Sequence, residues 1–142
     1  MQGYNVILLY DVNIEHLLLC KRKKEPYRGR MNLIGGKIEY GENGIDSAYR
    51  EMLEEANVEK EAVDLFHVMD FKYYMSDCYV EVYAGKLKYD VEVSGDENEL
   101  IWSDLDCDFF DMEAYAGEGN IGHMIEQVKI NAELIFNNSS TK

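Results

Sequence analysis

The sequence is short of positive charge, and this shortage narrows the range of partners. The chain has 14 lysines and arginines and 28 acidic residues, which gives a formal net charge of −14. Such a charge disfavours polymeric nucleic acid or an anionic membrane surface as the main partner. A small nucleotide stays compatible, because a bound metal ion can neutralise phosphate locally. The charge also keeps a protein of this size soluble.

Cysteine and histidine are equally scarce, and neither forms a ligand motif. An odd number of cysteines without a spacing pattern is typical of free thiols in a reducing cytosol, so we expect a cytoplasmic protein. The scattered histidines offer no paired Cys or His site for zinc. These residues are Cys20, Cys78 and Cys107, and His16, His67 and His123.

Long apolar runs, repeats and flexible linkers are also missing. No apolar run approaches the roughly 18 residues that cross a bilayer. The apolar N-terminal stretch follows no basic region, so it indicates a first strand rather than a signal peptide. The 142 residues contain a single proline, Pro26, and no segment rich in Pro, Gly or Ser. We therefore expect one domain over residues 1–137 and a polar tail at 138–142.

The hydrophobic pattern predicts mixed α and β structure. Short runs rich in apolar, aromatic and β-branched residues are typical of strands. They cover residues 5–10, 16–20, 31–34, 63–74, 77–88 and 101–105. Helical spacing predicts a helix that ends near Ala56 and a closing helix over 120–137. A basic loop at 21–30 and an acidic loop at 90–100 separate some of these elements, and a Gly35–Gly36–Lys37 turn precedes the first helix.

Three glutamates fall on one face of the first helix. Glu51, Glu54 and Glu55 are neighbours there, and the apolar residues lie on another face. Like charges at this spacing cost roughly 0.2–0.5 kcal/mol per pair. One interpretation is a solvated acidic face, and the other is a site for Mg²⁺ or Mn²⁺, which prefer oxygen ligands. Asn43 is a candidate N-cap, and Asn57 suits a left-handed helix end.

Residues 36–58 have the spacing of the Nudix box, and the chain resembles that family of metal-dependent hydrolases that split diphosphates linked to another group. The matching positions are Gly36, Glu42, Arg50, Glu51, Glu54 and Glu55. Asn57 stands where the box has a second glycine. The resemblance implies an α+β fold, an α/β/α sandwich with a mixed β-sheet between helices and a loop-helix-loop metal site.

The resemblance also implies roles for the box residues. Glu54 and Glu55 would be the principal metal ligands, and Glu51 a further ligand or the residue that orients water. Arg50 would hold the glutamates in place, and Glu42 would anchor the loop. The backbone carbonyl of Gly36 or Lys37 would complete the metal shell.

The identity of the general base varies in the family, so several acids are candidates. Glu54 and Glu51 come first. Glu97 is an outside candidate because it precedes Trp102 in the segment DENELIW. The alternative interpretation of Glu97 is a solvated acid in the acidic loop.

Substrate recognition has weaker support from the sequence. Residues 31–37 resemble the entry to the box in mammalian oxidised-purine nucleoside triphosphatases, where an asparagine faces the base, so Asn32 could bind a purine edge. Met31 and Leu33 depart from that pattern. Asn120 resembles a base-reading asparagine of the MutT type, although a helix N-cap is the simpler interpretation. Asp111 or Glu118 could supply the acidic base contact.

The basic loop allows two interpretations. Six cations between residues 21 and 30 could steer a triphosphate toward the metal, with Lys23, and Lys37 beyond the loop, as candidate substrate contacts. They could equally form a solvated loop that opposes the acidic surface.

The leading hypothesis is a Mg²⁺-dependent nucleoside triphosphate diphosphatase that releases a monophosphate and pyrophosphate, with oxidised purine nucleotides among its candidate substrates. The box recognises a diphosphate and not the appended group, so a hydrolase of ADP-ribose, nucleotide sugars or dinucleoside polyphosphates is the alternative. A non-catalytic nucleotide-binding sensor is less favoured, because such domains usually lose box glutamates and this chain has all four. The partner is a small nucleotide, and a monomer or a homodimer fits.

Overall fold

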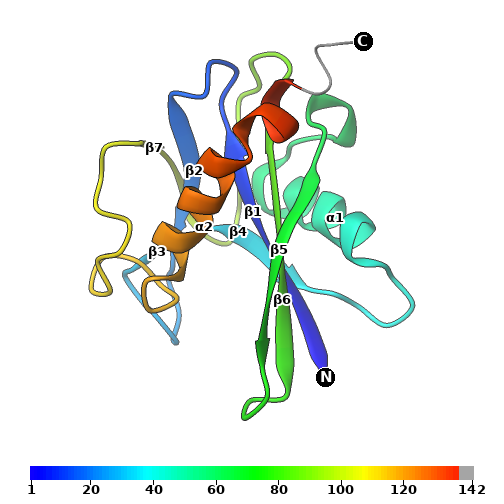
Figure 1. The fold of residues 1–142 in the computed structure, drawn as a ribbon, viewed down its shortest axis with the longest axis vertical. Helices are drawn as coiled ribbons and strands as arrows, with labels where there is room; N and C mark the ends of the chain where they lie inside the picture. Colours follow the sequence, from blue (N-terminus) through cyan, green and yellow to red (C-terminus); the bar gives the residue numbers. More distant parts are fainter. Residues whose placement is uncertain (138–142) are drawn as a thin grey trace.

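A mixed β-sheet forms the centre of the molecule (Figure 1). The computed structural model describes residues 1–137. In the sheet, β1 runs parallel to β6 and antiparallel to β2 and β4. The strands of the described residues are β1 (Gln2–Tyr10), β2 (His16–Lys21), β3 (Met31–Asn32), β4 (Ile34–Lys37), β5 (Phe66–Tyr73), β6 (Cys78–Lys86) and β7 (Glu99–Asp104). The strands predicted over 63–74 and 77–88 correspond to β5 and β6, which pair antiparallel.

Two helices cover opposite faces of the sheet, α1 (Gly44–Ala56) and α2 (Asn120–Ile130). Successive side chains of a strand point to opposite faces. Ile7 and Leu9 of β1 therefore pack in the cluster that contains Met52 of α1, while Leu8 packs in the cluster that contains Ile125 of α2. This arrangement confirms the predicted α/β/α sandwich. A short 3₁₀ helix (Lys60–Ala62) follows α1.

The predicted Gly-Gly turn before α1 is wrong, because both glycines belong to β4. Gly35 pairs with Val6 and Gly36 with Asn5 of β1. A Cβ at Gly35 would collide with the backbone carbonyl oxygen of Asn5, and the φ of Gly35 is +147°. Gly35 thus allows β4 to approach β1 closely, which a residue with a side chain at this position could not do.

The closing helix is shorter than the predicted range 120–137. It ends at Ile130, where the side chain of Asn131 donates a hydrogen bond to the Gln127 carbonyl at 2.8 Å. A π-helical turn (Glu133–Asn137) follows and still buries Ile135. The predicted tail at 138–142 lies outside the described residues. No helix within residues 1–137 has the length and apolar character to span a membrane.

Candidate metal and nucleotide site

The ends of α1 are fixed by two asparagines, as the sequence predicted. The Asn43 side chain accepts a hydrogen bond from the Asp46 N–H at 2.9 Å. Asn57 adopts φ 58°, and its N–H donates to the Leu53 carbonyl at 3.0 Å. These caps satisfy backbone groups that a helix leaves unpaired at its ends. They set the helix so that Met52 is buried and the glutamate face lies beside β4.

Arg50 binds three carboxylates and one backbone carbonyl. Its guanidinium donates to both oxygens of Glu42 at 2.8 and 2.9 Å, to Glu51 at 3.0 Å and to Glu54 at 3.2 Å. It also donates to the Lys37 carbonyl at 3.0 Å. The hydrogen bond from Arg50 is the main reason why the pKa of Glu42 falls to about 2. The contacts hold the Glu51 and Glu54 side chains on one side of α1.

Glu55 and Glu51 lie against the glycines of β4. The Gly35 N–H donates to the Glu55 carboxylate at 3.0 Å, and burial raises the pKa of Glu55 to about 7. Burial also raises the pKa of Glu51, against the opposing hydrogen bond from Arg50. A Cβ at Gly36 would lie 2.6 Å from the Glu51 carboxyl group. Gly36 therefore allows the Glu51 carboxylate to approach the backbone.

Two buried polar residues that the sequence analysis missed connect β1 to this face. Asn5 donates to the Ser47 hydroxyl at 2.7 Å and accepts from the Gly36 N–H at 3.3 Å. The Ser47 hydroxyl donates to the Lys37 carbonyl at 3.4 Å. Buried polar groups require such partners. The available signal was a serine on the apolar face of the helix and an asparagine within the first strand.

The donors on α1 suit a hard divalent cation, because all of them are carboxylate oxygens. They are not gathered into a compact cage, since the box glutamates are bound to Arg50 and Gly35. Within the described part of the chain, the groups whose ligand atoms lie within 4.8 Å of one another are Asp11–Glu15–His16 and His67–Asp70–Glu81. The fit of a metal at α1 therefore rests on the donor chemistry and on the close approach of the Glu51 carboxylate to Gly36.

The structure brings Glu97 and Lys23 close to Glu55. All three line a pocket of about 200 Å³, which we call the carboxylate pocket. The negative charges of Glu51 and Glu97 contribute to the raised pKa of Glu55. The Lys23 N–H donates to the Asn98 side chain at 3.3 Å, which ties the basic loop to the acidic loop. The predicted contact Lys37 is exposed and does not line this pocket.

A second pocket, of about 120 Å³, brings together Asn32 and Asn120. Phe71 and Tyr73 of β5 and Tyr27 of the basic loop also line it, and we call it the aromatic pocket. The Asn32 side chain accepts from the neighbouring Leu33 N–H at 2.8 Å, as a strand-end asparagine does. Ring faces and amide groups in one pocket suit a nucleobase.

The interpretation of Asn120 as the N-cap of α2 is wrong. Gly119 occupies the cap position, with φ 90°, and Asn120 is the first residue of the helix. The Asn120 side chain instead donates to the Tyr73 hydroxyl at 2.8 Å. Neither of the two acids considered for base contact, Asp111 and Glu118, lines the aromatic pocket. Glu118 accepts a hydrogen bond at 2.5 Å from the hydroxyl of Tyr27, which does line it.

The fold of this chain is similar to that of several solved structures, although its sequence matches no curated protein. Among solved structures, a Caenorhabditis elegans Ap4A hydrolase is similar with a TM-score of 0.72 and 19% identity, over 92% of this chain and 96% of that one. The Escherichia coli dihydroneopterin triphosphate pyrophosphohydrolase gives 0.70 and 18%, over 91% and 95%. A Francisella tularensis bifunctional NMN adenylyltransferase/ADP ribose pyrophosphatase gives 0.69 and 18%, over 89% and 40%.

At these identities the structural likeness shows the fold alone, and the names of the three proteins point to different substrates. The family is shown by sequence. A model of the NUDIX domain matches residues 2–123, a range that includes the whole box and the strands β1 to β7. The chain therefore belongs to the Nudix hydrolase family.

Proposed function

We propose that the protein is a Mg²⁺-dependent nucleoside triphosphate diphosphatase, for which Mn²⁺ can substitute and which releases a monophosphate and pyrophosphate. The observation that supports this function is the course of residues 32–36. Asn32 lines the aromatic pocket, and a few residues later Gly35 and Gly36 contact Glu55 and Glu51. Because this short segment connects the aromatic pocket to the carboxylates, a purine in the pocket, oxidised purines included, would direct its phosphates toward them.

Glu54, Glu55, Glu51 and the Gly36 carbonyl would hold the metal, since the Lys37 carbonyl already accepts from Arg50 and Ser47. When bound, a divalent ion screens phosphate charge, lowers the pKa of a bound water and stabilises the leaving pyrophosphate. Glu54 is the best general base, because 57% of its side chain is exposed, compared with 13% for Glu51.

The remaining residues bind and orient the substrate. Asn32 and Asn120 present amide groups to the base edge, and Phe71 and Tyr73 provide ring faces for stacking. Lys23 lies at the carboxylate pocket and neutralises phosphate charge. Lys37 is exposed beside Gly36 and is the second candidate phosphate contact, while Glu97 remains an alternative proton acceptor beside Glu55.

The experiment is release of pyrophosphate and orthophosphate with Mg²⁺, comparing the wild type with Glu54→Gln. The panel contains normal and 8-oxo purine triphosphates, ADP-ribose, UDP-glucose and diadenosine polyphosphates. Loss of a general base lowers kcat by about 10²–10⁴-fold. The control Glu59→Gln changes an exposed glutamate outside α1 and is expected to stay within about twofold of the wild type.

Pyrophosphate release from a triphosphate, lost in Glu54→Gln, would support the proposal and identify the base. Cleavage of ADP-ribose or UDP-glucose alone would contradict the assignment to triphosphates. An absence of turnover over the whole panel would favour the sensor.

A further inference from the structure

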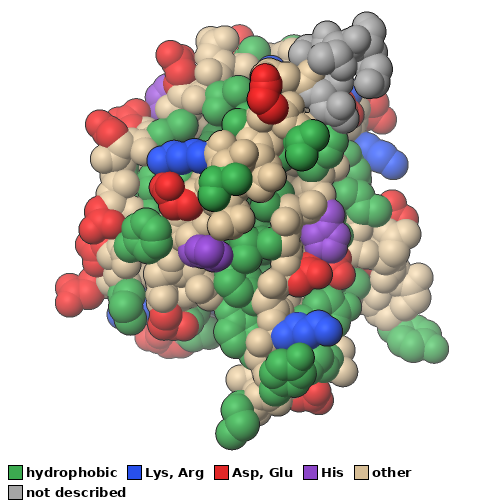
Figure 2. Space-filling view, viewed as in Figure 1, with side chains coloured by type: hydrophobic (Ala, Val, Ile, Leu, Met, Phe, Trp, Pro, Cys, Tyr) green, Lys and Arg blue, Asp and Glu red, His purple; other side chains and the backbone are tan. Residues whose placement is uncertain are grey.

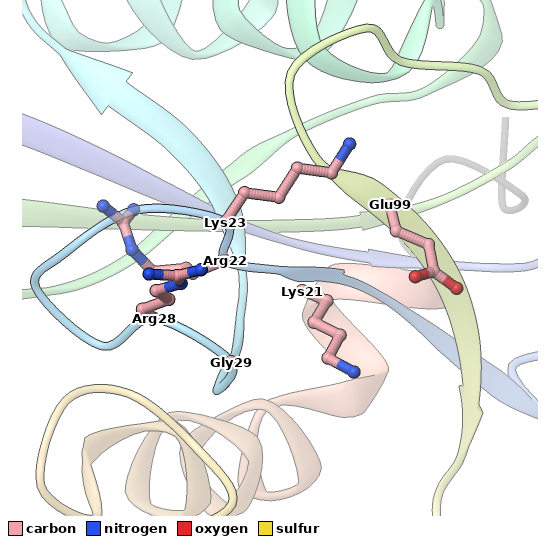
Figure 3. Close-up of a pocket in the computed structure, with 6 residues that line it drawn as sticks. All are labelled: Lys21, Arg22, Lys23, Arg28, Gly29 and Glu99. Atoms are coloured by element: carbon pink, nitrogen blue, oxygen red, sulfur yellow. The ribbon is translucent and has the colours of Figure 1, made fainter.

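The basic loop and the start of β7 enclose a pocket of about 350 Å³ (Figure 3). We call it the basic pocket; it is lined by Lys21, Arg22, Lys23, Arg28, Gly29 and Glu99. Four cations and one acid are an unusual lining in a chain with a net charge of −14. Acidic side chains are spread over the face of the molecule shown in Figure 2, which makes a local excess of cations more distinct.

The cations of this pocket have no acidic partner. In residues 1–137, the ion pairs of lysine and arginine involve Arg50, Lys88 and Lys129. Lys21 lies opposite Glu99 in the β2–β7 register, but their charged groups form no ion pair. Like charges that share a pocket repel one another, and an anion between them would relieve this repulsion. The pocket is therefore electrostatically complementary to an anion.

Hydrogen bonds close the basic loop and fix the Arg22 side chain. The Arg22 N–H donates to the Arg30 carbonyl at 2.9 Å, and the Gly29 N–H donates to the Arg22 carbonyl at 2.8 Å. The Arg22 side chain also donates to the Pro26 carbonyl at 2.8 Å. Figure 3 shows the Arg22 and Arg28 side chains on the same side of the loop, with Lys23 extending away from Lys21. A closed loop lowers the entropy cost of binding a ligand.

The basic pocket adjoins the carboxylate pocket. Arg22 and Lys23 line both, and Glu55 and Glu97 line the second. A phosphate chain that passes the box glutamates would thus continue between Arg22 and Lys23 into the basic pocket.

We propose that the basic pocket binds the terminal phosphate of the substrate and selects chains of three or more phosphates over two. The inference rests on the proposed function, because it assigns the distal end of the same substrate. Lys21 and Arg28, which do not line the carboxylate pocket, are the selecting residues. ADP-ribose and UDP-glucose carry only two phosphates, and neither has a phosphate for this pocket.

The kinetic test uses the double variant Lys21→Gln/Arg28→Gln. Its matched control is Lys72→Gln/Lys86→Gln, which makes the same change in charge at residues of β5 and β6 that form no ion pair. We expect kcat/KM for a nucleoside triphosphate to fall about tenfold or more, equivalent to the loss of one charge-assisted contact. The kcat/KM of the double variant for two-phosphate substrates should stay within about twofold of the wild type. Equal losses on both substrate classes would overturn the proposal.

A binding test separates this inference from the proposed function. Calorimetry with Mg²⁺ compares inorganic tripolyphosphate with pyrophosphate as probes, and needs no turnover. The double variant should bind tripolyphosphate about tenfold more weakly and pyrophosphate as before. That result in a protein without turnover would reject the diphosphatase and keep the pocket. Orthophosphate is a third probe. If the variant loses only orthophosphate binding and keeps wild-type triphosphate kinetics, the pocket holds a free anion and the proposal is wrong.

Discussion

The glutamate face of α1 and the aromatic pocket are built in different ways. The glutamate face comes from residues 35–55, and Arg50 joins most of its carboxylates through hydrogen bonds between near neighbours. The aromatic pocket draws Asn32, Phe71 and Asn120 from a strand, a second strand and a helix that are far apart in the sequence. Under the proposed function, the first region would carry groups for the reaction, and the second would carry groups for choosing the base. Variants should therefore separate turnover from base preference.

Among the variants that compare these two regions, Arg50→Lys is expected to have the largest effect. A lysine lacks the planar fork that binds both oxygens of Glu42 and reaches Glu51 and Glu54 together. Small displacements of catalytic groups cost about 10²-fold, so kcat/KM should fall by roughly that factor on every substrate. Steady-state kinetics over several bases checks this, and the ratios between bases should not change. A shifted base preference would show that the two regions are not separable.

Asn32→Ala is the complementary variant in the aromatic pocket. An amide that pairs with a base edge is worth about 1–3 kcal/mol of discrimination, so preference among bases should weaken about tenfold or more. The exposed turn residue Asn13 provides the control Asn13→Ala. The measurement is kcat/KM for competing triphosphates. A uniform loss for all bases would mean that Asn32 supports the strand and does not contact the base.

The same contrast explains what the sequence could predict. The spacing of Glu51, Glu54 and Glu55 fixes their shared helical face, and Asn43 and Asn57 are local signals for helix ends, so these features followed from short-range rules. The hydrophobic pattern likewise predicted mixed α and β structure, and the resemblance to the Nudix family implied the sandwich.

Features that depend on distant contacts did not follow from those rules. Gly35 is part of a strand because it approaches Asn5, and the sequence around Gly35 carries no sign of that neighbour. Asn120 contacts Tyr73, which is 47 positions away, and Gly119 takes the cap instead. The buried pair of Asn5 and Ser47 spans 42 positions and was missed for the same reason.

A smaller effect concerns stability, and it comes from Glu55. Burial raises the pKa of Glu55 from 4.5 to about 7, so the folded protein holds a proton that the unfolded chain releases between those values. The free energy of unfolding of the metal-free protein should therefore fall as the pH rises from 4.5 to about 7, and it should level off above that range. Glu55→Gln keeps an acceptor for the Gly35 N–H and loses the charge.

Denaturant titrations in EDTA at several pH values measure the effect. Above pH 7, Glu55→Gln should be more stable than the wild type by on the order of 1 kcal/mol, and the difference should vanish near pH 4.5. Glu59→Gln is again the control. A constant difference at all pH values would mean that the substitution changes packing and not ionisation.

The smallest effect is expected at Asn57, where this chain departs from the box. The residue adopts φ 58°, and its described hydrogen bonds come from the backbone N–H. A left-handed conformation costs most residues about 1–2 kcal/mol, so Asn57→Ala should lower the free energy of unfolding by about 1 kcal/mol. Asn57→Gly removes the strain and loosens the unfolded chain, so it should stay within about 0.5 kcal/mol of the wild type. Chemical denaturation measures both, and turnover should not change in either. The box requires a left-handed backbone conformation at this position and no particular side chain, which is why asparagine can replace its glycine.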